Sequence, residues 1–372
     1  MKIYIIAGEA SGDLHGANLV KAFNTLDSSI EWKGWGGDLM EAQGVELFRH
    51  IKDLAFMGFA EVLINLKTIL GNLKSCKEDV KTFNPDAVIL IDYPGFNLRI
   101  TPYIKNLGIP VLYYISPQIW AWKSNRVHAI KKFIDRVYCI LPFEQEFYGR
   151  FGVEVEYVGH PLLDELDLKD FSSDTETEKR IALLPGSRKQ EISKILPIML
   201  TMVKEFPDHH FSIAAAPSID LSFYEMFTRG QDVKIIYGNT YGILQEADAA
   251  LVTSGTATLE AALIGVPEVV CYKGNVISYM IARQVVKVKY ISLVNLIMDR
   301  EVVTELIQAD LNTKRLKSEL GKIIIAGPHR KAMRDSFQDL RKVLGGKGAS
   351  ERTAKSMLKK IDELAKGAKG EK

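Results

Sequence analysis

The chain has 372 residues, of which 47% are hydrophobic and 25% are charged, and its formal net charge is +2. This length suffices for two domains with sizeable cores, and the composition is that of a globular protein. The small net charge argues against a general affinity for nucleic acid, and no apolar run approaches the roughly 18 residues that a membrane span needs.

The cysteines and the N-terminus indicate a cellular compartment. Cys76, Cys139 and Cys271 are scattered, without a CxxC pair or a neighbouring histidine. This pattern favours a reducing environment and argues against a structural zinc site. The apolar run at residues 3–7 is too short for a signal peptide and predicts a first strand. We therefore expect a cytoplasmic protein, or one that touches a membrane only from the side.

The first half of the chain alternates apolar strand-like runs with helical segments, which is typical of an α/β protein. Residues 2–7 form the first predicted strand, and the turn at 8–13 opens a helix that ends near Leu26. The glycines of this turn match neither GxGxxG nor a Walker loop. Glu9 lies at the end of this strand, where a glutamate is structural about as often as it is functional. Further strands are predicted at 30–35, 87–92, 110–115, 136–141 and 154–158.

Residues 51–70 contain more apolar side chains than one buried helix face needs, among them Phe56, Met57 and Phe59. An exposed apolar surface of this kind suits contact with lipid acyl chains or a membrane. A fully buried helix, or a helix in a homodimer interface, is the alternative.

Asp92 follows an apolar strand, in the sequence IDYPGFN at 91–97. The carboxyl end of a parallel strand is where such folds place active groups, and Glu9 faces the same crevice if the two strands lie close together. Pro94 and Gly95 define the turn, and Asn97 is expected to cap the next helix. The alternative for Asp92 is a purely structural carboxylate that caps this helix or binds turn amides.

Another strand end carries the sequence SPQIWAWK at 116–123. Its two tryptophans, Trp120 and Trp122, suit stacking on a sugar or lining of an acyl pocket. Packing at the rim of the domain is equally consistent with them.

The polar segment 166–179 predicts a linker between two domains, at 1–165 and 180–345. A second set of strands begins after it, at 180–184, 210–215, 233–237, 249–252 and 268–272. Two domains of this kind leave a cleft between them. From about Asn312 the pattern is helical, and we expect the final segment, 346–372, to form a helix that docks back on the body.

Two turns of the second domain favour phosphate binding. The strand at 180–184 leads into Pro185, Gly186, Ser187 and Arg188 at a helix start, and an arginine offers paired hydrogen bonds that match a diphosphate. A helix cap followed by a solvated arginine is the alternative.

The second turn lies in the stretch 249–273, which predicts a strand, a glycine turn, a helix and another strand. Ser254, Gly255 and Thr256 expose backbone N–H groups at the helix start, which is a site suited to phosphate. Glu260 lies one helical turn further on, where a carboxylate suits two ribose hydroxyls. An ordinary crossover with a surface glutamate is the alternative.

Six segments together resemble one enzyme family: GEASGD at 8–13, IDYPGFN at 91–97, SPQIWAWK at 116–123, LLPGSRKQEI at 183–192, SGTATLEA at 254–261 and YISLVNLI at 290–297. In this order they are similar to lipid-A-disaccharide synthase, a glycosyltransferase family of Gram-negative bacteria. The resemblance implies an α/β fold of the GT-B type, with two Rossmann-like domains whose parallel sheets face a central cleft, and a helical C-terminus.

The resemblance also implies a reaction. Members join UDP-2,3-diacylglucosamine to 2,3-diacylglucosamine 1-phosphate, form a β-1,6-linked disaccharide and release UDP. The family needs no catalytic metal or other cofactor. Its donor is bound by the second domain and its acceptor by the first. From the apolar 56–70 region and the lysine-rich C-terminal segment, we expect peripheral association with the inner face of the cytoplasmic membrane.

The family's residue roles transfer to matching positions. Asp92 corresponds to the essential aspartate, Arg188 to the donor-site arginine and Asn295 to the asparagine of the late SLVN segment. Glu9 corresponds to the acidic residue of the first turn. From the residues themselves, we place Ser11 and Trp120 with Glu9 on the acceptor side, and we add Ser187, Ser254, Gly255, Thr256 and Glu260 to the donor positions.

Other functions on the same fold stay open from the residues alone. A UDP-sugar epimerase and a peptidoglycan glycosyltransferase are alternatives within enzymes, although the apolar 56–70 region and SPQIWAWK argue against both. A nucleotide-sugar sensor or a lipid-carrier protein would bind without turnover.

Overall fold

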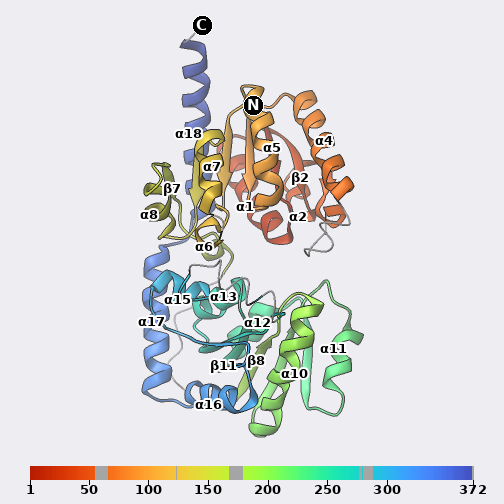
Figure 1. The fold of residues 1–372 in the computed structure, drawn as a ribbon, viewed down its shortest axis with the longest axis vertical. Coiled ribbons are helices and arrows are strands. Elements are labelled where there is room, and N and C mark those ends of the chain that lie inside the picture. Colours follow the sequence, from red (N-terminus) through yellow and green to blue (C-terminus); the bar gives the residue numbers. More distant parts are fainter. Residues whose placement is uncertain (55–65, 123, 167–178, 276–278, 280–287, 371–372) are drawn as a thin grey trace. The chain divides into compact units, whose positions relative to one another are not determined.

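The computed structural model describes residues 1–54, 66–122, 124–166, 179–275, 279 and 288–370. It divides into two compact units, residues 1–165 with 346–372 (unit 1) and residues 166–345 (unit 2) (Figure 1). The segment with Phe56, Met57 and Phe59, and nearly all of the predicted linker, lie outside the described residues. None of the described helices is both long and apolar enough to span a bilayer.

Within its described residues, unit 1 contains one parallel sheet in the order β3-β2-β1-β4-β5-β6-β7. Its strands are β1 (Lys2–Ile6), β2 (Glu31–Gly36), β3 (Glu46–His50), β4 (Ala87–Ile91), β5 (Val111–Tyr114), β6 (Arg136–Cys139) and β7 (Val155–Tyr157). Its helices are α1 (Ala10–Leu26), α2 (Asp38–Glu41), α4 (Leu66–Phe83), α5 (Pro94–Asn106), α6 (Ile119–Trp122), α7 (Val127–Phe133), α8 (Glu144–Gly149), α9 (Leu162–Glu165) and α18 (Ala349–Gly370).

Alternation along the strands gives unit 1 a core on each face of its sheet. In β1, Ile3 and Ile5 pack into one cluster, whereas Tyr4 and Ile6 pack into the other. This follows from the two-residue period of a strand, and both faces are apolar because helices cover both (Figure 1). The C-terminal helix α18 packs against α1 and buries Ala354, Met357 and Ile361, among other side chains, in the first cluster.

Unit 2 repeats this plan with a second parallel sheet, in the order β10-β9-β8-β11-β12-β13 within the described residues. Its strands are β8 (Arg180–Leu184), β9 (His210–Ala215), β10 (Val233–Tyr237), β11 (Ala249–Thr253), β12 (Glu268–Tyr272) and β13 (Thr304–Ile307). Its helices are α10 (Lys189–Glu205), α11 (Leu221–Thr228), α12 (Thr240–Glu246), α13 (Thr256–Ile264), α15 (Leu293–Met298), α16 (Thr313–Ile324) and α17 (Pro328–Leu344).

The two parallel sheets confirm the predicted α/β class, but each sheet has an edge strand that the sequence analysis did not predict. These strands are β3 and β13, whose sequences ELFRH and TELI show no fully buried apolar run. An edge strand buries less of its surface than a central one, so its apolar signal is weak.

In each sheet, the direction in which successive strands are added reverses once. In unit 1 the chain moves outward from β1 in one direction through β2 and β3, then crosses to β4 on its other side. In unit 2 the same reversal lies between β8 and β11. In parallel sheets, ligands bind beyond the carboxyl ends of the strands at such a switch point.

Candidate active site

The turns after β1 and β4 meet at the switch point of unit 1. These two strands pair in parallel, with Ile6 opposite Leu90, so Glu9 and Asp92 emerge at the same sheet edge. Gly8 lies so close to the Tyr93 ring that an added Cβ would be 2.4 Å from its carbon atoms. Glycine is therefore required at this position, because only a residue without a side chain lets the turn after β1 contact Tyr93 in the turn after β4.

Asp92 is a half-buried carboxylate with a raised pKa of about 6. Burial is the main cause, because it disfavours the charged form, and the negative charge of Glu9 raises the pKa further. A hydrogen bond from the Tyr93 N–H to the carboxylate acts in the opposite direction. The structure thus brings Glu9 and Asp92 together, as the sequence analysis expected.

The backbone at Asp92 is held in an unusual conformation. Asp92 and Tyr93 have φ angles of 40° and 48°, in the left-handed region that non-glycine residues seldom adopt. The Asp92 carbonyl accepts hydrogen bonds from the Tyr113 hydroxyl at 2.5 Å and from Asn97 Nδ2 at 2.7 Å. These bonds hold the strained turn in place, and strain of this kind concentrates at functional sites.

The expected cap at Asn97 is wrong. The helix α5 begins after Tyr93 without a side-chain cap, and the buried Asn97 instead binds the carbonyls of Ile91 and Asp92. The N-cap position is occupied by Tyr93 and not by Asp92, but the Asp92 carboxylate accepts the Tyr93 N–H, so the alternative of a carboxylate that binds turn amides stays open.

The remaining acceptor-side residues of the prediction lie nearby in the same unit. Ser11 is exposed in the first turn of α1. Trp120 is half-buried in α6, after β5, and its Nε1–H donates to the carboxylate of Glu144 at 3.3 Å. Glu144 is a buried acidic residue that the sequence analysis did not identify, and its only signal there was its position shortly after a strand.

The turns after β8 and β11 meet at the switch point of unit 2. These strands pair in parallel, and a Cβ at Gly186 would lie 3.5 Å from the Thr253 methyl carbon, so the turns are in contact. Gly186 has a φ of 106°, a conformation that favours glycine. Ser187 and Arg188 are exposed at the start of α10, where Arg188 forms an ion pair with Glu191 at 3.1 Å.

The second turn of unit 2 presents the start of α13. Gly255 and Thr256 are exposed, whereas the Thr258 N–H already donates to the Gly255 carbonyl at 3.2 Å. Ser254 Oγ donates to the Ile291 carbonyl at 2.9 Å, which ties the turn to the segment before α15. Such an N-terminus suits an anion.

Glu260 lies one turn into α13 and is half-buried. Burial raises its pKa, and a hydrogen bond from the Tyr241 hydroxyl at 3.2 Å opposes this shift. The Tyr241 hydroxyl therefore orients the Glu260 carboxylate, which can still accept a further hydrogen bond.

Asn295 is buried and uses its whole side-chain amide inside unit 2. Its Nδ2 donates to the Val303 carbonyl and to Glu305, both at 2.9 Å, and its Oδ1 accepts from Val302 and Val303 N–H groups. Glu305 in turn accepts from the N–H groups of Ile291 and Ser292. Asn295 can therefore serve a donor site only by holding the segment to which Ser254 is bound.

Comparison with known proteins identifies the family. The family model for lipid-A-disaccharide synthetase matches residues 3–361. A lipid-A-disaccharide synthase from Syntrophus aciditrophicus is 41% identical over 97% of this chain and 98% of its own length. One from Myxococcus xanthus is 39% identical over 96% of this chain and 97% of its own.

Solved structures share the fold at low sequence identity. A UDP-GlcNAc 2-epimerase from Neisseria meningitidis has a TM-score of 0.67 and 14% identity, covering 96% of this chain and all of its own. The calicheamicin glycosyltransferase CalG4 has a TM-score of 0.64 and 15% identity, with 98% and 99% covered. These likenesses show the GT-B-type fold alone, whereas the sequence matches over nearly the whole chain confirm the resemblance of the six segments: the chain belongs to the lipid-A-disaccharide synthase family.

Proposed function

We propose that the chain transfers the sugar of UDP-2,3-diacylglucosamine to the 6-hydroxyl of 2,3-diacylglucosamine 1-phosphate. Family membership supports this reaction. One observation supports the assignment of roles: the four predicted turns meet in pairs at the two switch points. The turns after β1 and β4 carry carboxylates in unit 1, and the turns after β8 and β11 suit phosphate in unit 2. Unit 1 therefore binds the acceptor and unit 2 the donor.

Asp92 is the general base of the proposed reaction. With a pKa of about 6 it is ionised at neutral pH, yet it is basic enough to accept a proton. It takes the proton of the acceptor 6-hydroxyl as that oxygen attacks C1 of the donor sugar. The bond from C1 to the phosphate oxygen breaks, and UDP leaves with the electron pair.

Unit 2 stabilises the departing UDP. Arg188 and the N–H groups of Gly255 and Thr256 donate to the diphosphate, where negative charge increases as the bond breaks. The Ser254 N–H is not among these donors, because it donates to the Cys271 carbonyl at 3.2 Å. Ser187 lies on the same turn as Arg188 and adds a hydroxyl donor. Glu260 accepts hydrogen bonds from the ribose hydroxyls, and Asn295 holds the segment behind Ser254.

The test is a reaction of the pure protein with both substrates, followed by mass spectrometry of the products. Formation of the disaccharide 1-phosphate and one equivalent of UDP is the expected result. Epimerised UDP-sugar without an acceptor would indicate an epimerase. Binding of UDP without any product would indicate a sensor or carrier protein.

We also propose that the protein associates peripherally with the inner face of the cytoplasmic membrane, where its acylated substrates reside. The apolar segment 56–70 and the lysine-rich α18 support this proposal, and Leu70 in α4 is 57% exposed. A homodimer interface through the same segment is the alternative.

Replacement of Phe56, Met57 and Phe59 by serine should release the protein from anionic lipid vesicles in a flotation assay while it stays folded. Met226→Ser is the matched control, because Met226 is 59% exposed in α11 of unit 2 and should not alter vesicle binding. Unfolding of the triple variant would show that these side chains are core, and a change of sedimentation coefficient without loss of vesicle binding would favour the dimer.

A further inference from the structure

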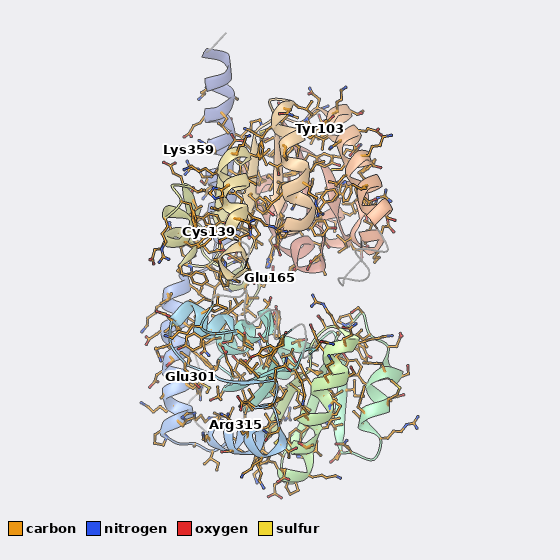
Figure 2. All side chains as sticks on the ribbon, viewed as in Figure 1. Tyr103, Cys139, Glu165, Glu301, Arg315 and Lys359 are labelled. Atoms are coloured by element: carbon orange, nitrogen blue, oxygen red, sulfur yellow. The ribbon has the colours of Figure 1, made fainter. Side chains whose placement is uncertain are left out.

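Glu144 begins α8, directly after β6, and is only 1% exposed. Figure 2 labels Cys139, the last residue of this strand. Both carboxylate oxygens of Glu144 are occupied. Oε1 accepts from Ser116 Oγ at 2.7 Å and Trp120 Nε1 at 3.3 Å, and Oε2 accepts from the N–H groups of Leu141 at 3.0 Å and Ile140 at 3.2 Å.

These bonds join two neighbouring turns at the carboxyl edge of the sheet. Ser116 and Trp120 follow β5, whereas Ile140 and Leu141 follow β6, and the two strands pair in parallel. A further hydrogen bond, from the Tyr148 hydroxyl to Ser116 Oγ at 3.2 Å, anchors the same group. Glu144 therefore determines where the segment 116–120 lies.

The held segment lies beside Asp92. β5 is the direct neighbour of β4, and the Asp92 N–H donates to the Tyr114 carbonyl at 3.2 Å. Tyr113, on β5, donates to the Asp92 carbonyl. One network of hydrogen bonds thus connects Asp92 with the strand that precedes the tryptophan segment.

Trp120 contacts a neighbouring ring but remains partly accessible. Its ring meets Phe143 edge to face, with centroids 4.9 Å apart and an angle of 87° between the planes, and the side chain is half-buried. An indole fixed in this way offers an apolar surface to the C–H groups of a sugar ring.

Burying a carboxylate costs free energy, because the charged form loses its hydration. Burial raises the pKa of Glu144 to about 7, although the bonds from Ser116, Leu141, Ile140 and Trp120 act against this shift. A glutamine could not replace it, because its amide nitrogen would place a donor against one of the two donor pairs.

We propose that Glu144 is the positioning residue of the acceptor side, which fixes the Trp120 indole so that its accessible surface packs on the sugar ring of the acyl-glucosamine phosphate acceptor. This inference rests on the proposed function. Glu144 itself touches neither substrate nor reacting atoms, and it acts through Trp120.

The first test is Glu144→Gln, with the kinetic constants for each substrate measured separately. We expect the acceptor KM to rise about tenfold, with the donor KM unchanged and kcat within about threefold, since one hydrogen bond from a neutral donor to the carboxylate is lost. The control is Glu146→Gln, the same change two residues further along α8, where the glutamate is exposed and pairs with Arg150. It should leave all constants unchanged.

A double-mutant cycle with Trp120→Ala tests whether the two residues act as one unit. In the alanine background, Glu144→Gln should change the acceptor KM less than about twofold, because the ring that it positions is gone. Independent, multiplicative effects would overturn the proposal, as would equal changes in donor and acceptor KM.

Trp120→Phe keeps the test valid if Glu144→Gln does not fold. It removes the N–H that donates to Glu144 but keeps an aromatic ring, and the acceptor KM should rise several-fold. An unchanged acceptor KM in this variant would contradict the proposal.

Acceptor binding without donor, followed by indole fluorescence, separates this inference from the proposed reaction. If the wild type makes no disaccharide, the proposed function fails. If acceptor binds wild type and Glu144→Gln with equal affinity, the positioning role fails.

Discussion

The two switch points share one topology but differ in chemistry. In unit 1 the edge between β1 and β4 carries two carboxylates, and its turn holds Asp92 and Tyr93 in left-handed conformations. In unit 2 the edge between β8 and β11 carries a glycine turn and the exposed Arg188. In the proposed function, the same fold therefore places a proton acceptor at one edge and an anion site at the other.

The backbone conformation differs between the turns at the two sheet edges. A non-glycine residue in the left-handed region costs on the order of 1–3 kcal/mol, and Tyr113 and Asn97 hold the Asp92 carbonyl against this strain. Gly186 adopts a positive φ without such a cost. We infer that unit 1 accepts strain to orient one carboxylate, whereas the turns of unit 2 combine unstrained backbone amides with the exposed Arg188 side chain.

Removal of the charge at Asp92 should give the largest effect. Asp92→Asn keeps the size and the backbone bonds of the turn, so kcat should fall by roughly 10²–10⁴ while the donor KM changes little. Steady-state kinetics and thermal unfolding check this. Near-normal kcat would end the general-base assignment and with it the contrast between the two edges.

Loss of the cation at Arg188 should affect donor binding. A charge-assisted hydrogen bond contributes about 1.5–3 kcal/mol, so Arg188→Ala should weaken UDP binding roughly ten- to a hundredfold in calorimetry. Arg315→Ala is the control, because this arginine of α16 is also exposed and paired with a carboxylate, Asp310. Unchanged UDP affinity in Arg188→Ala would remove this residue from the site.

The pH dependence tests the coupling of Glu9 to Asp92. Because the base must be ionised, activity of the wild type should fall as the pH drops below about 6. Glu9→Gln removes a negative charge that raises the pKa of Asp92. The acidic limb of the curve of activity against pH should therefore move to lower pH. A limb at the same pH in both proteins would show that Glu9 does not set the titration.

The raised pKa of Asp92 also makes the free energy of unfolding depend on pH. The folded pKa of Asp92, about 6, exceeds the ordinary value of about 3.9, so the folded state holds this proton more tightly than the unfolded state. The stabilisation is therefore present at low pH and is lost as the pH rises through this window. Asp92→Asn should lack this component in pH-dependent unfolding.

The smallest effect is expected at Tyr241. Tyr241→Phe removes the hydroxyl that donates to Glu260, which opposes the raised pKa of that carboxylate. UDP affinity should fall about two- to tenfold, in line with the net contribution of a single hydrogen bond that acts through Glu260. Equal loss of affinity in Tyr241→Phe and Glu260→Gln would show that the tyrosine acts through the glutamate, and no loss in either would exclude a ribose contact here.

Local sequence predicted most of the fold because its signals are short-range. Continuous apolar runs identified the central strands such as β4 and β11, and Gly186 and Gly255 marked turns at helix starts. The position of Asp92 after a buried strand indicated a functional sheet edge, and the six family segments indicated the reaction. The edge strands β3 and β13 were missed because they lack a buried apolar run.

The amino-acid sequence by itself determined which residue types stand at strand ends, since strand, turn and helix patterns depend on neighbours a few positions apart. Only the tertiary structure decided which of these residues meet. The adjacency of β1 and β4 brings Glu9 to Asp92, and the pairing of β5 with β6 brings Glu144 to Trp120 across 24 positions. It also showed that Asn295 is fully hydrogen-bonded, because satisfaction of a buried amide depends on groups that only folding brings within reach.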